Sequence, residues 1–183
     1  MFIRTLLTKL KGFRDDTKGS VTVEFALMMP LLFWAYVGTY VFFDGYRQSA
    51  INLKAAYTVG DMISRETQAI NNDYMDSMFE LTKLLIRTNS DMSLRVTVLR
   101  WDEEDNQYYL DWSSARGGAV AMTESQLVGV ALKLPVMPDE ERVILVETWN
   151  TWTPAFRVGL EQTSLDNFVF TRPRFAPQVV WAS

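Results

Sequence analysis

The stretch Phe25–Phe43 reads FALMMPLLFWAYVGTYVFF and contains no charged residue over nineteen positions. As a helix it would be about 29 Å long, which matches a hydrocarbon core of ~30 Å. A buried helix of a soluble protein is one alternative, but such a helix is rarely apolar on every face. A cleaved secretory signal is another, but its apolar region is shorter and a small-residue cleavage site follows it, whereas Asp44 and Arg47 follow here. The sequence therefore predicts a transmembrane helix, placed at 20–43.

The charges that flank this segment predict its orientation. Five cations precede it, namely Arg4, Lys9, Lys11, Arg14 and Lys18. Asp44 follows it directly, and Arg47 is the one cation nearby. Because short cytoplasmic flanks are rich in Lys and Arg, we expect residues 1–19 to be a cytoplasmic basic leader and residues 44–183 to lie outside the membrane.

Composition excludes several classes of function. The 183-residue chain contains neither cysteine nor histidine, which removes thiol nucleophiles, imidazole catalysis and the common zinc sites. An enzyme would have to use carboxylates, Lys, Tyr or Ser, and no arrangement of these suggests a reaction. The leader carries +3 of a net charge of -4, so the remainder sums to -7, which argues against a nucleic-acid surface. We expect no catalytic residue, metal or cofactor.

Two residues interrupt the apolar pattern. Glu24 stands at the start of the apolar run, where a carboxylate is costly unless it has a partner. Taken alone, it could equally be an acid that snorkels to the interface and favours the positive end of the helix dipole. Pro30 leaves the carbonyl of Ala26 without its usual donor, so we expect a kink or a locally melted turn there.

The context of Glu24 favours a functional role. The chain reads KGSVTVEF from Lys18 to Phe25: a basic leader, Gly19, four residues from Ser20, then Glu24 and Phe25. This resembles the processing site of type IV pilin precursors, where prepilin peptidase cuts after the glycine. Flp-type (tight-adherence, Tad) pilins have Gly, four residues and Glu-Tyr, and here Phe25 replaces the tyrosine. The whole segment resembles TadE/TadF-like minor pilins (pseudopilins), whose helix carries Val-Glu-Phe-Ala followed by a proline.

Near the other end, Arg172, Pro173 and Arg174 resemble an arginine-proline-arginine signature of TadE-like chains. The resemblance implies cleavage between Gly19 and Ser20, and recognition and assembly through Glu24 and Phe25. It implies a subunit of the bacterial inner membrane with a periplasmic domain, taking part in assembly of an adherence pilus. Its expected partners are membrane lipid, prepilin peptidase, other pilin subunits and the assembly platform. The alternative is an uncleaved single-pass anchor that carries a binding or sensor domain.

The outer region shows helical and then strand periodicity. We expect the first helix to continue past Phe43, with Tyr46, Ala50, Leu53, Tyr57 and Gly60 forming the face that packs against the body or against a partner helix. The run Asn71, Asn72 and Asp73 is a break and a helix-start signal, and a second helix is predicted at 73–87. A hairpin at 93–112 turns at the acidic run 102–106, which we interpret as a solvated turn and not as a calcium loop.

A short helix at 123–132 follows, with Thr123 and Gln126 as a capping box, and then a strand at 143–152. Further strands are predicted at 168–171 and at 178–181, the second of which would close the sheet edge. The fold class is therefore α+β and pilin-like: a long N-terminal transmembrane helix continues into an extracytoplasmic TadE-like domain with a small antiparallel sheet and short helices.

Overall fold

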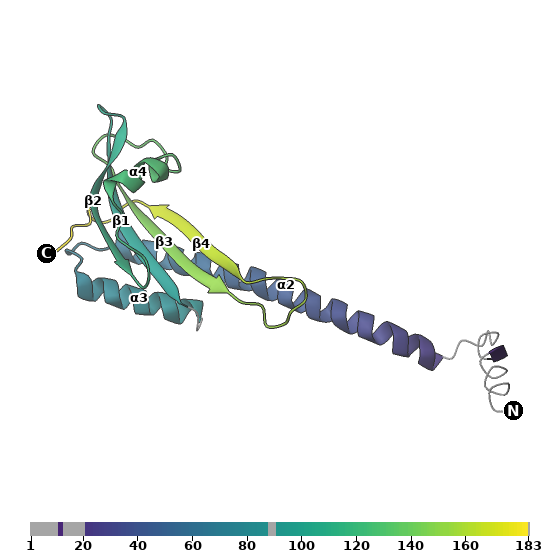
Figure 1. Cartoon of the computed structure of the whole chain (residues 1–183). Helices are drawn as coiled ribbons and strands as arrows, with labels where there is room; N and C mark the ends of the chain where they lie inside the picture. The colour runs from purple at the N-terminus through teal and green to yellow at the C-terminus, as the bar shows by residue number, and fades with distance from the viewer. Residues whose placement is uncertain (1–10, 13–20, 88–90, 183) are drawn as a thin grey trace.

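The computed structural model describes residues 11–12, 21–87 and 91–182. One helix, α2 (Val21–Ser64), dominates its shape, and its 44 residues span about 66 Å. The body is built on one half of α2, and the other half projects from it (Figure 1). The fold is α+β, with a long apolar N-terminal helix and a small antiparallel sheet, as expected.

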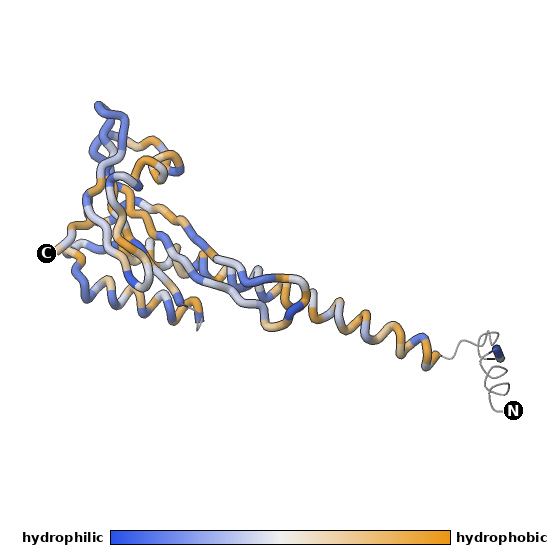
Figure 2. The backbone as a smooth tube through the Cα atoms, in the orientation of Figure 1, coloured by the Kyte–Doolittle hydropathy of each residue, from blue (hydrophilic) through white to orange (hydrophobic). Residues whose placement is uncertain are grey.

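The projecting half of α2 is long and apolar enough to cross a membrane, by length and composition. Only 6% of an eighteen-residue window in it is buried, and Val41, near its end, is the buried apolar side chain between Val21 and Phe43. Figure 2 shows the hydrophobic colouring concentrated along this projecting part. The helix is continuous through Pro30, without the melted turn that was one of the two expectations there.

The second half of α2 packs against the body through Ala, Gly, Val and Ile. Ala55, Ala56, Val59, Gly60 and Ile63 are all buried and recur at the spacing of one helical face. Because Ala and Gly have little or no side chain, the sheet can approach α2 closely. A Cβ at Gly60 would lie 3.6 Å from methyl groups of Thr171 and Val146.

The body leaves four of the five positions of the predicted face exposed, so the expectation that this face packs against the body is wrong there, while packing against a partner helix stays a prediction. Tyr46 is 65% exposed, Leu53 41% and Tyr57 57%, and Ala50 is exposed as well. Gly60 alone is buried. The predicted row mixes large and small residues, and the body covers a neighbouring face of the helix, which carries Ala56, Val59 and Ile63. We call the row Tyr46, Ala50, Leu53 and Tyr57 the outer stripe.

Four antiparallel strands form the sheet, in the order β2-β1-β3-β4. The predicted hairpin is confirmed as β1 (Met92–Asp102) and β2 (Gln107–Arg116). The strand predicted at 143–152 is β3 (Arg142–Trp152), which pairs with β1 and with β4 (Thr163–Thr171). β4 begins five residues before the predicted 168–171, because its first half is polar and lacks a hydrophobic alternation.

Helices cover both faces of the sheet. α2 and α3 (Asn72–Ile86) lie on one face, above a core that includes Leu94, Val96 and Val146. α4 (Glu124–Ala131) lies on the other, above Leu99 and Leu145. The predicted helix starts are confirmed: Asn71 caps α3 by accepting from the Tyr74 N–H at 2.9 Å, and Thr123 and Gln126 form the capping box of α4.

The C-terminal segment does not close the sheet edge, contrary to the prediction for 178–181. Trp181 instead makes an isolated parallel bridge to Ile70, in the connection between α2 and α3. The Ile70 N–H donates to the Val180 carbonyl at 2.8 Å, and the Ala182 N–H donates to the Ile70 carbonyl at 2.8 Å. Trp112 Nε1 donates to the Val179 carbonyl, also at 2.8 Å. The segment therefore crosses the α3 side of the sheet.

Candidate functional site

The residues that carry the pilin resemblance lie at the start of α2. Glu24 is in the first helical turn and exposed, and Phe25 is 60% exposed beside it. A carboxylate in a first turn is favoured by the helix dipole and by the unpaired backbone N–H groups there. Gly19 and Ser20, the predicted cleavage pair, lie outside the described residues. In the described chain, the side chains of Glu24 and Phe25 are thus open to an external partner.

Arg172, Pro173 and Arg174 immediately follow β4 and tie the chain back to the body. Arg172 forms an ion pair with Glu141, and Arg174 Nη1 lies 3.1 Å from Asp61 Oδ1 on α2. The Arg174 N–H donates to the Ser64 carbonyl at 2.7 Å, so it supplies a partner to the last residue of α2. Pro173, half-buried between the two arginines, cannot extend the strand. Both arginines therefore make ion pairs within the body.

The two motif regions are far apart. Asp61 is 37 positions along α2 from Glu24, which corresponds to about 55 Å of helix. The structure therefore does not bring Glu24 and Arg174 into one site. Each would have to act on its own, Glu24 at the free end of the helix and Arg174 within the body.

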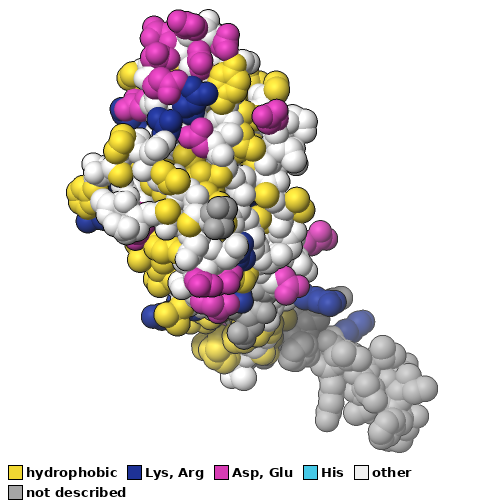
Figure 3. Space-filling view, turned by 90° about the vertical axis from the view of Figure 1, so that its left-hand side faces the viewer, with side chains coloured by type: hydrophobic (Ala, Val, Ile, Leu, Met, Phe, Trp, Pro, Cys, Tyr) yellow, Lys and Arg dark blue, Asp and Glu magenta, His cyan; other side chains and the backbone are white. Residues whose placement is uncertain are grey.

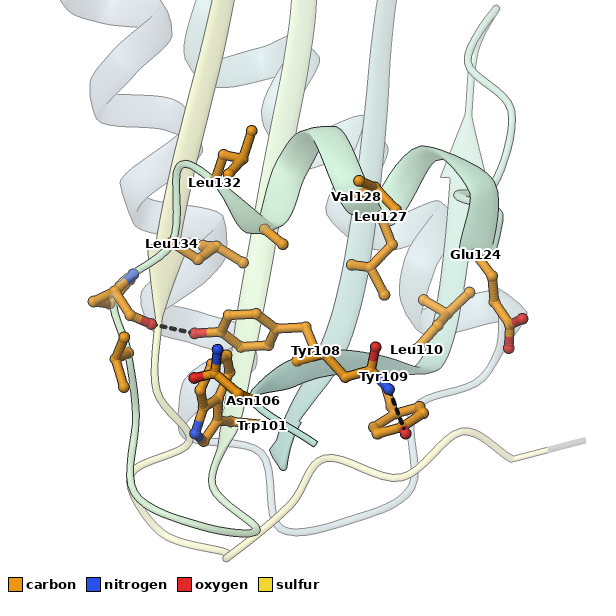
Figure 4. A pocket seen from close by; sticks show the side chains of 14 residues that line it. Trp101, Asn106, Tyr108, Tyr109, Leu110, Glu124, Leu127, Val128, Leu132 and Leu134 are labelled. Carbon is orange, nitrogen blue, oxygen red and sulfur yellow. Dashed lines mark hydrogen bonds between the residues drawn. The ribbon is translucent and has the colours of Figure 1, made fainter. Parts of the chain in front are cut away.

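A separate hollow of about 620 Å³ opens between the β1–β2 hairpin and α4 (Figure 4). Tyr108 lies at its centre, with Leu127 and Leu134 on one side and Trp101 on the other. Val128, Leu132 and Val136 are 73%, 88% and 79% exposed at the hollow's edge. Its size and apolar, aromatic lining are those of a small-ligand pocket.

Polar side chains, among them Gln107 and Glu124, line this hollow beside the apolar ones. The Tyr108 hydroxyl donates to the Pro135 carbonyl at 2.5 Å, and burial raises the pKa of this phenol. Trp101 Nε1 is buried and has no acceptor among the described residues. Such a donor could bind a ligand oxygen, but a neutral phenol and an indole provide no acid, base or nucleophile at neutral pH. The hollow can bind a ligand, and Glu124 is the one carboxylate among its described lining residues.

The acidic turn between β1 and β2 stands at the tip of the body, where Figure 3 shows the acidic side chains gathered. Two of its carboxylates accept hydrogen bonds from neighbouring residues. Asp102 Oδ1 accepts the Asp105 N–H at 3.0 Å, and Asp105 accepts from the Tyr109 hydroxyl. Among the residues that the structure describes, no group of three or more acidic side chains is placed to hold a metal ion.

Sequence reasoning did not find the hollow. Its wall combines the two strands of the hairpin with a helix and a loop some twenty residues further on, and no local spacing links them. The only signal was the excess of apolar residues on the short helix: Val128 and Leu132 lie four apart and both remain exposed.

Comparison with protein-family models, with curated proteins and with solved structures gives no match to this chain. The resemblance to minor pilins therefore rests on the residues of the chain itself, at 18–43 and at 172–174.

Proposed function

We propose that this protein is a minor pilin (pseudopilin) of the tight-adherence type, held in the inner membrane by α2 until it takes part in pilus assembly. One observation carries the proposal. The projecting half of α2 is apolar and uncovered, and its one acid from Val21 to Phe43 is Glu24, five positions after the glycine at which a prepilin peptidase would cut. The C-terminal domain would then be periplasmic.

The coupling of cleavage to assembly follows from charge. In a bundle of such helices, Glu24 would be buried, and a buried carboxylate without a partner costs several kcal/mol. Cleavage before Ser20 creates a new amine, which could pair with the Glu24 carboxylate of a neighbouring subunit. The outer stripe supports this arrangement, because it continues the exposed apolar surface of α2 into the body half and would let a neighbouring helix pack along both halves.

The first experiment concerns cleavage. In a cell with an active prepilin peptidase, we expect the mass of the purified protein to correspond to a chain beginning at Ser20. Gly19→Leu should leave the leader attached. Gly12→Leu is the matched control, since a Cβ at Gly12 would meet nothing within 4 Å and the residue lies within the leader. An uncut wild-type chain would contradict the proposal.

The second experiment concerns Glu24. Glu24→Gln keeps size and polarity and removes only the charge, so it should be cleaved and inserted but should fail to co-purify with pilus components. Asp73→Asn, which removes the first-turn acid of α3, is the matched control and should assemble normally. Assembly of the Glu24→Gln protein at the wild-type level would show that intersubunit pairing is not its role.

The hollow of about 620 Å³ favours a second candidate, an anchored domain that binds a small apolar ligand through Trp101 and Tyr108. This function requires no cleavage and predicts recovery of the chain from Met1. It also predicts that Leu127→Glu, which places a charge in the hollow, abolishes ligand binding, as measured by quenching of tryptophan fluorescence. Under the minor-pilin proposal, the same variant should assemble normally if it folds.

A further inference from the structure

The connection between β3 and β4, residues 153–162, lies along α2 on the side toward its projecting half (Figure 1). We call it the β3–β4 loop. It reads TPAFRVGLEQ, and its large apolar side chains are not withdrawn into the body: Phe156 is 52% exposed and Leu160 37%. A loop in contact with water alone would not be expected to present both.

The loop touches α2 at a defined depth. The rings of Phe156 and Tyr40 meet edge to face with their centroids 6.5 Å apart. Tyr40 lies three residues inside the apolar segment that ends at Phe43, or about 4.5 Å along the helix axis. If Phe25–Phe43 crosses the bilayer, Phe156 must therefore lie level with the outer boundary of the hydrocarbon region.

The base of the loop is fixed to the helix just above that level. Trp152 Nε1 donates to Asp44 Oδ2 at 3.1 Å, and the Trp152 ring lies so close to Gly45 that a Cβ there would be 3.2 Å from it. These contacts hold Trp152, the residue that precedes the loop, against α2. Beside them, Phe42, Tyr46 and Leu160 help to line an apolar hollow of about 240 Å³.

Aromatic side chains surround α2 at this level. The ring centroids of Phe42 and Tyr46 lie 5.0 Å apart, edge to face. Tyr40, Trp152 and Phe156 lie at the same level, so two separate parts of the chain contribute aromatic side chains here. Tyrosine and tryptophan are enriched where a membrane protein crosses the interface, because one end of each ring system is apolar and the other polar. Arg157, exposed next to Phe156, is a cation suited to an anionic headgroup.

From this geometry we infer that the β3–β4 loop is a second membrane contact, with Phe156 and Leu160 inserted into the outer interface of the phospholipid bilayer beside α2. The inference rests on the membrane placement of α2 in the proposed function, and it adds a role for the body. α2 alone would leave the body free to tilt, whereas two contacts hold it at one angle to the membrane surface.

The test uses the absence of cysteine, since any single cysteine introduced will be the only site that a thiol-reactive fluorophore labels. The full chain is reconstituted in phosphatidylcholine–phosphatidylglycerol vesicles that contain lipids with a nitroxide near the headgroup end of the acyl chain. Ala155→Cys reports on the loop with Phe156 intact, Gly38→Cys on α2, and Glu104→Cys on the distant hairpin tip. A Cβ at Gly38 would meet nothing within 4 Å, so this substitution fits.

We expect the nitroxide lipid to lower emission from the Ala155→Cys label by about twofold, because interfacial side chains bury about 5–10 Å into the headgroup boundary. The Gly38→Cys label should also be quenched, and the Glu104→Cys label should not. Quenching at Gly38 without quenching at Ala155 overturns the loop contact and leaves the membrane placement intact. Absence of quenching at both positions overturns the membrane placement and the loop contact together.

A second variant separates insertion from simple proximity. Phe156→Ser combined with Leu160→Ser removes the two apolar side chains, both partly exposed, so the fold should persist. With this pair added, quenching at Ala155→Cys should fall toward that at Glu104→Cys. Unchanged quenching would mean that α2 alone holds the loop near the lipid and that the two side chains do not insert, which would overturn the inference.

Discussion

The two halves of α2 belong to one continuous helix, but the body covers mainly one of them. The half from Val21 to Phe43 carries Phe, Leu, Met, Trp and Tyr, and nearly all of them are exposed. The half from Asp44 to Ser64 buries Ala, Gly, Val and Ile against the sheet and leaves its tyrosines outside. The body covers a face of Ala, Gly, Val and Ile on one half of the helix and leaves the aromatic side chains of both halves outside.

The end of the charge-free run predicts where the body begins, at Asp44, but hydropathy did not predict which face of the body half is buried. A membrane helix needs bulky apolar groups because lipid imposes no shape, whereas a sheet packed on a helix needs a close, complementary surface. The comparison between the halves can be tested by making matched substitutions in each of them.

The largest effect is expected from a cavity in the body half. Ile63 is 0% exposed in the main core, so Ile63→Ala should lower the free energy of unfolding of the body by about 2–5 kcal/mol. Leu32→Ala, in the projecting half, should leave it within about 0.5 kcal/mol of the wild type. Urea unfolding in detergent micelles, followed by tryptophan fluorescence, measures both. Similar losses for the two variants would mean that the halves do not differ as described.

A charge in the projecting half gives the next effect. Leu32→Arg should disfavour membrane insertion by about 2.5–3.5 kcal/mol, because the guanidinium would lie near the middle of the segment. Thr58→Arg, on the exposed face of the body half, should insert like the wild type. Insertion into microsomes, scored by glycosylation of an added acceptor site, gives the comparison. Equal insertion of the two proteins would argue that Leu32 is not in the membrane.

The junction of the halves can be tested with a pair of glycines. A side chain at Gly45 would meet the Trp152 ring, so Gly45→Leu should cost about 1–3 kcal/mol of body stability and disrupt the Trp152–Asp44 hydrogen bond. At Gly38 there is nothing within 4 Å, so Gly38→Leu should have no effect on the body. Thermal unfolding and the fluorescence of Trp152 report the two changes. A stable Gly45→Leu protein would show that Trp152 can move away at little cost.

The smallest effect is expected at the far end of the body half. Asp61 pairs with Arg65 at 2.8 Å and with Arg174 at 3.1 Å, and all three side chains are well exposed. Asp61→Asn should therefore lower stability by only roughly 0.2–1 kcal/mol, and the difference should shrink in about 1 M salt. A loss that salt does not reduce would assign Asp61 a role beyond ion pairing.

Much of the fold was predictable because local signals agreed with the final structure. The hairpin alternation at 93–112, the cap at Asn71 and the capping box at Thr123 and Gln126 all act over a few residues, and each was confirmed. The failures concern contacts between distant segments. The bridge between Trp181 and Ile70 could not be predicted, because nothing near either residue indicates the other.

The candidate site shows the same contrast between local motifs, which could be predicted, and contacts between distant segments, which could not. Glu24 and Phe25 were identified from a motif of adjacent residues, and their exposure at the start of α2 agrees with an external role. The partners of Arg172 and Arg174, which are Glu141 and Asp61, lie on a loop and a helix far away in sequence. The loop contact of Phe156 with Tyr40 was missed for the same reason.

The C-terminal segment also has a consequence for the order of folding. The body half of α2 is synthesised early, but the strands that cover it lie at 142–171, and the residues that bridge Ile70 are nearly the last in the chain. A fold dominated by such long-range pairings closes slowly, because each distant contact must overcome loop-closure entropy. If the body is exported as proposed, the face of α2 that carries Ala56, Val59 and Ile63 stays uncovered by β3 and β4 until residues 142–171 have crossed the membrane. During that interval, export machinery or a chaperone outside the membrane would find its most exposed target on the helix face that the finished protein hides.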